Sequence, residues 1–243
     1  MWPVRQKYEL VGESRVARKG RVVHRYDPTE YPSVVGEIGK LYEGDTGRVL
    51  DFAHTWGMLG WQHPQEQEAA EPLAWLWSHA SNVRLVLQMA YFLQTQDERG
   101  LDTLLTAYCS PEELEVESGP HMYIAQPDWP PHEVAFRWRP GDATQVAREV
   151  SSFIVQANLE EIRPLQPKPD TSSLRAATYQ HLRNVVLGRR SVVRCDNAAC
   201  RALFVARDKR QRYCPAPPPW TDGKDSLCAV RDRMRRHRER KGS

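Results

Sequence analysis

Four of the five cysteines in this 243-residue chain lie close together near its C-terminal end. They are Cys195, Cys200, Cys214 and Cys228, and their spacing is Cys-x4-Cys-x13-Cys-x13-Cys. Because four thiolates complete the tetrahedral shell of Zn²⁺, this set predicts a structural zinc site without an open catalytic position. The alternative interpretation is four unlinked thiols. Cys109 lies far upstream, and we expect it to be a small buried residue with no part in metal binding.

Few apolar residues accompany these cysteines, and the main ones are Leu203, Phe204, Val205 and Tyr213. A core of this size is too small to keep the segment folded alone. We therefore expect metal binding to supply much of its folding free energy. Loss of any one ligand should release the metal and loosen residues 190 to 240, while the rest of the chain stays folded.

The residues around the cysteines resemble the CGNR zinc-finger family of bacteria. That family usually has Cys-x4-Cys-x2-Leu/Trp-Phe, then an Arg-Trp/Tyr-Cys step and a final Cys-Gly-Asn-Arg. The present chain has Cys195-x4-Cys200-Arg201-Ala202-Leu203-Phe204-Val205, then Arg212-Tyr213-Cys214, then Cys228-Ala229-Val230-Arg231. The final tetrad keeps only its two ends, and the gap over residues 215–227 is longer than the family normally has. The upstream residues 49–60 are also similar to a stretch that precedes such fingers. The resemblance implies Zn²⁺ as cofactor and a nucleic-acid-binding regulator of transcription.

Basic residues crowd the segment that follows Cys228. Residues 189–243 hold 16 Lys and Arg against 6 Asp and Glu, whereas residues 1–188 hold 18 against 25. This split predicts a basic arm that meets a polyanion. A helix from Cys228 onward would carry a thin apolar stripe of Val230 and Met234, with Leu227 before them, which we expect to lie on the zinc module. Its arginines are the predicted phosphate contacts to duplex DNA: Arg231, Arg233, Arg235, Arg236, Arg238 and Arg240. The alternative is a solvated tail.

Motifs of enzymes are not found in the sequence, and we expect a protein that is not an enzyme. Its eight histidines form no His-Glu-x-x-His pair, and the chain has no Gly-x-Ser-x-Gly elbow or Gly-rich phosphate loop. The competing functional class is a protein-interaction adaptor in which the zinc module is purely structural. Binding through phosphates weakens steeply with added salt, whereas binding through an apolar interface does not.

The expected fold is mainly α with a small β-hairpin: a helical N-terminal domain plus a small C-terminal zinc module. Residues 1–163 form the first domain, 164–190 a linker and connecting helix, and 191–243 the zinc module with its basic helix. Apolar spacing predicts helices from Asp45 to Gly57, from Glu71 to Gly100, through Leu101 to Leu105, from Val146 to Leu159 and from Ser172 to Leu187. The hairpin is expected over residues 121–125 and 133–138, and residues 1–40 as a strand or extended arm.

The chain carries no apolar run of the roughly 20 residues that a membrane span needs. Its N-terminus also lacks the apolar stretch of a signal peptide. We therefore expect a cytoplasmic protein without membrane contact, whose N-terminal domain senses a signal or forms a homodimer.

Overall fold

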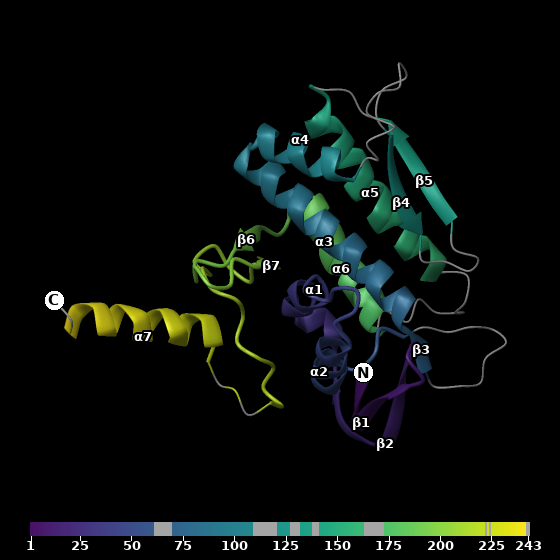
Figure 1. The fold of residues 1–243 in the computed structure, drawn as a ribbon, viewed down its shortest axis with the longest axis vertical. Helices are drawn as coiled ribbons and strands as arrows, with labels where there is room; N and C mark the ends of the chain where they lie inside the picture. Colours follow the sequence, from purple (N-terminus) through teal and green to yellow (C-terminus); the bar gives the residue numbers. More distant parts are fainter. Residues whose placement is uncertain are drawn as a thin grey trace.

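A computed structural model describes residues 1–60, 70–108, 121–126, 132–137, 141–162, 173–221, 223 and 225–241. It shows a mixed α/β protein with an N-terminal sheet, a helical body and a C-terminal cysteine cluster (Figure 1). The mainly α prediction is thus confirmed only in part, because the N-terminal sheet adds a second layer. Cys109 and residues 164–172 of the predicted linker and connecting helix lie outside the described residues.

The N-terminal sheet is antiparallel, with strand order β1-β2-β3. Strands β1 (Trp2–Val11) and β2 (Arg15–Tyr26) form a long hairpin, and β3 (Ala70–Pro72) pairs with the start of β2. Alternate residues of the hairpin face the body, so Val4, Tyr8, Val16 and Tyr26 are buried. The strand expected over residues 1–40 is therefore a full hairpin, followed by a short 3₁₀ turn over Pro28–Glu30.

Two helices follow the hairpin, and the second of them packs against β1. Helix α1 (Ser33–Ile38) was not predicted, whereas α2 (Thr46–Trp56) begins and ends as expected. Asp45 caps α2, since its carboxylate accepts a hydrogen bond from the Arg48 N–H at 3.0 Å. Gly57 ends it with φ of +84°, a conformation that favours glycine.

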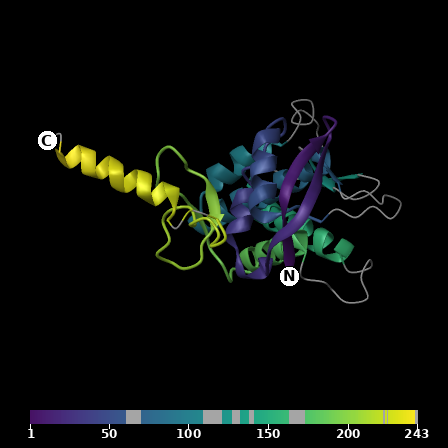
Figure 2. The same ribbon diagram turned by 90° about the horizontal axis from the view of Figure 1, so that it is seen from below.

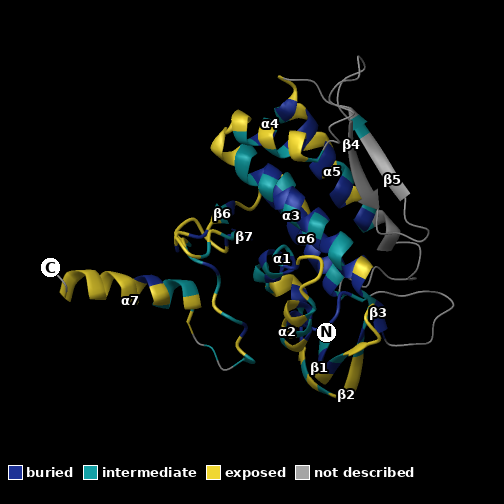
Figure 3. Ribbon diagram, in the orientation of Figure 1, coloured by how far each residue is buried: buried dark blue, intermediate teal, exposed yellow. Residues whose placement is uncertain are grey.

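The body is built around α3 (Leu73–Thr95), which packs against α4 (Glu98–Ala107), α5 (Ala143–Ile162) and α6 (Leu174–Val186) (Figures 1 and 3). Helix α3 ends before the predicted Gly100, because Asp97 caps the following helix through the Gly100 N–H at 2.9 Å. The predicted β-hairpin is present as β4 (His121–Gln126) and β5 (His132–Arg137).

The metal-binding segment comprises β6 (Val192–Arg194), β7 (Leu203–Val205) and α7 (Leu227–Lys241). Val192 and Val205 belong to the same apolar core as the helical body, so this hairpin is seated on the body. The division of the chain at 163 and 190 stays a prediction. Helix α7 projects away from everything else (Figures 1 and 2). Within the described residues, no helix is both long and apolar enough to cross a membrane.

Candidate metal centre

The four predicted cysteines come together in space. The sulfur atoms of Cys195, Cys200, Cys214 and Cys228 all lie within 4.8 Å of one another, and those of Cys200 and Cys214 are 3.5 Å apart. A tetrahedral Zn²⁺ with bonds of about 2.3 Å to sulfur requires S···S separations of about 3.8 Å. The four thiols are therefore positioned to bind a metal ion, and a set of four soft sulfur donors fits zinc.

The first two ligands lie on a turn that joins β6 to β7. The Cys195 N–H donates to the Ala202 carbonyl at 2.9 Å, and the Cys200 N–H donates to the Asn197 carbonyl at 2.9 Å. The Asn197 side chain also accepts from the Ala199 N–H at 3.1 Å. Arg201 completes the turn with φ of +51°. These bonds point both thiols to the same side of the hairpin.

The other two ligands arrive on separate segments. Two contacts fix the segment before Cys214 to the residue that follows Cys195. The Arg212 carbonyl accepts a hydrogen bond from the Asp196 N–H, and the Arg212 guanidinium pairs with the Asp196 carboxylate, both at 2.9 Å. Cys228 lies in the first turn of α7, where Ser226 caps the helix by accepting from the Ala229 N–H at 3.3 Å. The positive end of the helix dipole favours a thiolate at this position.

Without a metal, the thiols differ in acidity. Burial raises the pKa of Cys214, and burial together with the neighbouring Cys200 raises the pKa of Cys228 to about 11. Burial acts in the same direction on Cys200, but a hydrogen bond from the Ala202 backbone and contacts with the other thiols outweigh it and lower its pKa. Metal binding must therefore displace protons from Cys214 and Cys228 at neutral pH.

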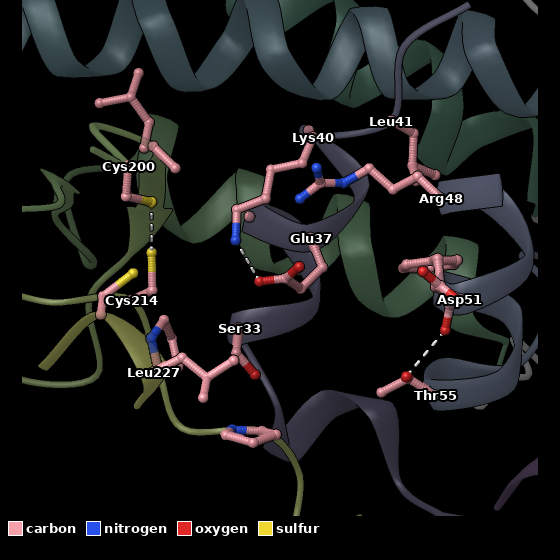
Figure 4. Close-up of a pocket in the computed structure, with 18 of the residues that line it drawn as sticks. Ser33, Glu37, Lys40, Leu41, Arg48, Asp51, Thr55, Cys200, Cys214 and Leu227 are labelled. Atoms are coloured by element: carbon pink, nitrogen blue, oxygen red, sulfur yellow. Dashed lines mark hydrogen bonds and ion pairs between the residues drawn. The ribbon is translucent and has the colours of Figure 1, made fainter. Parts of the chain in front are cut away.

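A cation from the N-terminal half faces the sulfurs. Lys40 follows α1, its side chain is only 19% exposed, and its ammonium pairs with the Glu37 carboxylate. Figure 4 shows Lys40 extending toward Cys200 and Cys214. Burial acts to lower the pKa of Lys40, but Glu37 and the two thiols outweigh it and raise the pKa. Since four thiolates around Zn²⁺ carry a net charge of −2, this ammonium is placed to stabilise the loaded centre.

The metal-binding hairpin is seated on α1 through a close backbone approach. A Cβ added to Gly36 would lie 3.0 Å from Cβ of Phe204 and 3.2 Å from the carbonyl oxygen of Leu203. Phe204 is fully buried at this contact. The absence of a side chain at Gly36 thus lets β7 pack against the helix that positions Lys40.

Between α1, α2 and the metal-binding segment lies an open cavity of about 1130 Å³ (Figure 4). Cationic side chains from both halves line it, among them Lys40, Arg48 and Arg231, together with Cys200 and Cys228. Of the six predicted phosphate contacts, Arg231 is the one that faces this cavity. The cavity leaves one side of the metal centre accessible to solvent.

Helix α7 directs a polar face toward the metal centre. Asp232 is 6% exposed and accepts from the Tyr213 hydroxyl at 2.7 Å. It also pairs with Arg235 at 2.9 Å and with Arg236 at 2.6 Å, and Arg235 pairs in addition with Glu239 at 2.6 Å. The hydrogen bonds from Tyr213 and Arg235 hold the pKa of Asp232 at about 2. Arg235 and Arg236 are therefore engaged within the module.

The expected packing of the apolar stripe on the module is wrong. Met234 is 52% exposed and Leu227 is 66% exposed, and Val230 is only half-buried. The reason is that Asp232 follows Cys228 by one helical turn, so the face bonded to Tyr213 is the face that meets the module. The stripe points outward instead, and α7 is exposed over most of its length (Figure 3).

The remaining arginines flank this outward stripe. Arg231 and Arg238 lie on one flank, and Arg233 and Arg240 on the other, by the helical spacing of seven residues. All four are exposed, and none forms an ion pair with another residue that the structure describes.

In comparisons with known proteins, no family model, curated protein or solved structure matches this chain.

Proposed function

We propose that this protein is a zinc-binding, CGNR-type bacterial transcription regulator that binds duplex DNA through α7. The observation that carries the proposal is a helix that starts at a metal ligand, projects from the body and presents four exposed arginines, which form no ion pair with other residues that the structure describes. The residues shared with the CGNR pattern, from Cys195 to Arg231, support the choice of zinc and of nucleic acid.

The dimensions of α7 suit a DNA groove. Its 15 residues span about 22 Å, and the major groove of B-DNA, about 12 Å wide, admits a single helix. The two arginine flanks then face the phosphates of the two strands, and Met234 lies between them toward the base edges. Zinc fixes the base of the helix through Cys228, so the arginines are held relative to the body rather than on a free tail.

A second candidate is the adaptor function, in which α7 binds another protein. The exposure of Leu227 and Met234 favours it, since exposed apolar side chains in a row mark interaction surfaces. In that case zinc serves only to hold the helix.

Two double variants of α7 separate these functions. Arg233→Ala with Arg238→Ala removes two outward arginines, and Arg235→Ala with Arg236→Ala removes the same charge from the inward face. Affinity for a random duplex is measured at several salt concentrations. The outward pair should weaken binding and reduce the slope of log K against log salt by about 1.8, at about 0.9 for each phosphate contact. The inward pair should leave that slope unchanged.

The result that overturns the proposal is an equal slope for the outward pair and the unmodified protein. Tight binding of another protein with little salt dependence, lost on Met234→Ser, would establish the adaptor instead. Zinc content is measured for each variant, so that loss of the metal is not mistaken for loss of a DNA contact.

A further inference from the structure

The long segment between Cys214 and Cys228 is anchored on the N-terminal half of the chain. Its Trp220 lies in a cage of four aromatic side chains from the N-terminal part of the chain. The centroid of the Trp220 ring is 4.5 Å from those of His24 and Tyr26, 5.0 Å from that of Tyr31 and 5.8 Å from that of Trp56. The Trp220 indole N–H donates to the Thr55 carbonyl at 2.9 Å. This contact joins residues 165 positions apart.

Three of the cage residues also contact one another. The Tyr26 hydroxyl donates to the Trp56 carbonyl at 2.6 Å, and Tyr31 contacts both Tyr26 and Trp56 edge to face. Tyr26 and Trp56 are buried. The rings thus keep their positions through contacts with each other, and Trp220 adds a stacked partner with a hydrogen-bonded polar tip, the arrangement that buried tryptophans favour.

Residues 215–221, which carry Trp220, form a defined turn. Residues 215 and 217–219 are prolines, which restrict the backbone, and Pro218 is buried. The carbonyl of Pro218 accepts from the Thr221 N–H at 3.0 Å and from the Thr221 hydroxyl at 2.7 Å, which forms a tight turn around Trp220. We call residues 215–226 the strap, and its described residues 218–221 form a defined bend.

Trp220 divides the gap between two metal ligands. It follows Cys214 by six positions and precedes Cys228 by eight. When Trp220 is seated, each cysteine is tethered to a fixed point by a short segment. When it is not, Cys228 and α7 are tethered to Cys214 by the whole gap, and their return to the metal costs more loop-closure entropy.

We propose that seating of Trp220 in this aromatic cage is energetically coupled to metal binding by the four cysteines, so that Trp220 is a positioning residue for Cys228 and α7. The coupling links the N-terminal sheet to the helix that we assign to DNA. It is reciprocal: the metal favours the seated strap, and the seated strap raises metal affinity by the same factor. The inference rests on the zinc-binding part of the proposed function and is independent of what α7 binds.

The first experiment removes the metal and follows Trp220. The protein is labelled with ¹⁵N, the indole signal of Trp220 is identified by its loss in Trp220→Phe, and exchange of that N–H with solvent is measured with Zn²⁺ and after chelation. Because the N–H is bonded to Thr55 only in the seated state, chelation should accelerate its exchange at least about tenfold. An exchange rate that is the same with and without Zn²⁺ would show an anchor uncoupled from the metal and overturn the inference.

The second experiment changes the cage and follows the metal. Zn²⁺ affinity is measured by competition with a chromophoric chelator for Trp220→Ala, for Tyr31→Ala on the cage side, for both together, and for Ala216→Ser, an exposed control in the same strap. Each single change should weaken Zn²⁺ binding about tenfold, the double change should weaken it no further, and the control should match the unmodified protein.

These outcomes distinguish failure of the proposed function from failure of the coupling between Trp220 and the metal. If the unmodified protein binds no zinc, the proposed function fails. If it binds zinc with the same affinity in all four variants, only the coupling fails. Rescue of affinity in Trp220→Phe relative to Trp220→Ala would identify ring stacking, rather than the Thr55 hydrogen bond, as the main contribution.

Discussion

Replacement of Gly36 by alanine tests the contact that seats the metal-binding hairpin on α1. The new methyl group would meet Cβ of Phe204 at 3.0 Å, the Leu203 carbonyl oxygen at 3.2 Å and Cα of Phe204 at 3.3 Å. Two of these three atoms belong to the backbone of β7, so a side-chain rotation cannot relieve the overlap. The helix and the strand must move apart.

The expected effect combines two opposing terms. Alanine favours a helix over glycine by about 0.5 to 1 kcal/mol, and overpacking of a buried contact costs about 1 to 3 kcal/mol. The free energy of unfolding should therefore fall by about 1 kcal/mol. Gly47, in the first turn of α2, is the matched control, because its added Cβ would meet only the Asp45 carboxylate, at 3.9 Å. Gly47→Ala should be neutral or stabilise by up to about 1 kcal/mol.

Urea unfolding of both zinc-loaded variants measures this difference, which should be about 1 to 2 kcal/mol. If Gly36→Ala is as stable as Gly47→Ala, β7 does not pack on α1 as described, and the position assigned to Lys40 beside the sulfurs is refuted with it.

Further changes test the charge around the metal and the buried histidines. Lys40→Met should weaken Zn²⁺ binding about tenfold in chelator competition, as loss of an outer-shell partner does, whereas the exposed Lys209→Met should not; equal affinities would remove Lys40 from the metal site. His79 and His181 are buried, and burial lowers both pKa values, so below pH 6.5 the unfolded chain binds more protons than the folded one. The two histidines should leave stability unchanged above that pH and lower it below that pH by up to about 1.4 kcal/mol per pH unit each; denaturant unfolding at pH 7.5 and 5.5 checks this, and equal stabilities would contradict it.

The sequence was informative where the signal is local. Helix periodicity located α2, α3, α5 and α6, and the grouping of four cysteines in the sequence predicted the cluster that the structure forms. Residues 1–40 were predicted as a strand or extended arm, and they contain the hairpin β1–β2. The pairing of β2 with β3 joins residues about 55 positions apart, which a local pattern cannot connect. The short α1 contains too few residues for a period to show.

The features that could not be predicted from the sequence all depend on contacts between residues far apart in the chain. Lys40 and Trp220 are ordinary residues in their own segments, and only the fold brings one to the sulfurs and the other into the cage. The orientation of α7 was mispredicted for a related reason. Apolar spacing favoured burial of Met234, but the bond between Tyr213 and Asp232 fixes the opposite face against the module.

The most direct test of the central claim is the metal content of single cysteine variants, measured by native mass spectrometry. We predict one zinc per chain in the unmodified protein and in Cys109→Ala, and loss of that zinc in Cys214→Ser. Full zinc occupancy in Cys214→Ser, or loss of zinc in a folded Cys109→Ala, would contradict the four-cysteine site on which the account depends.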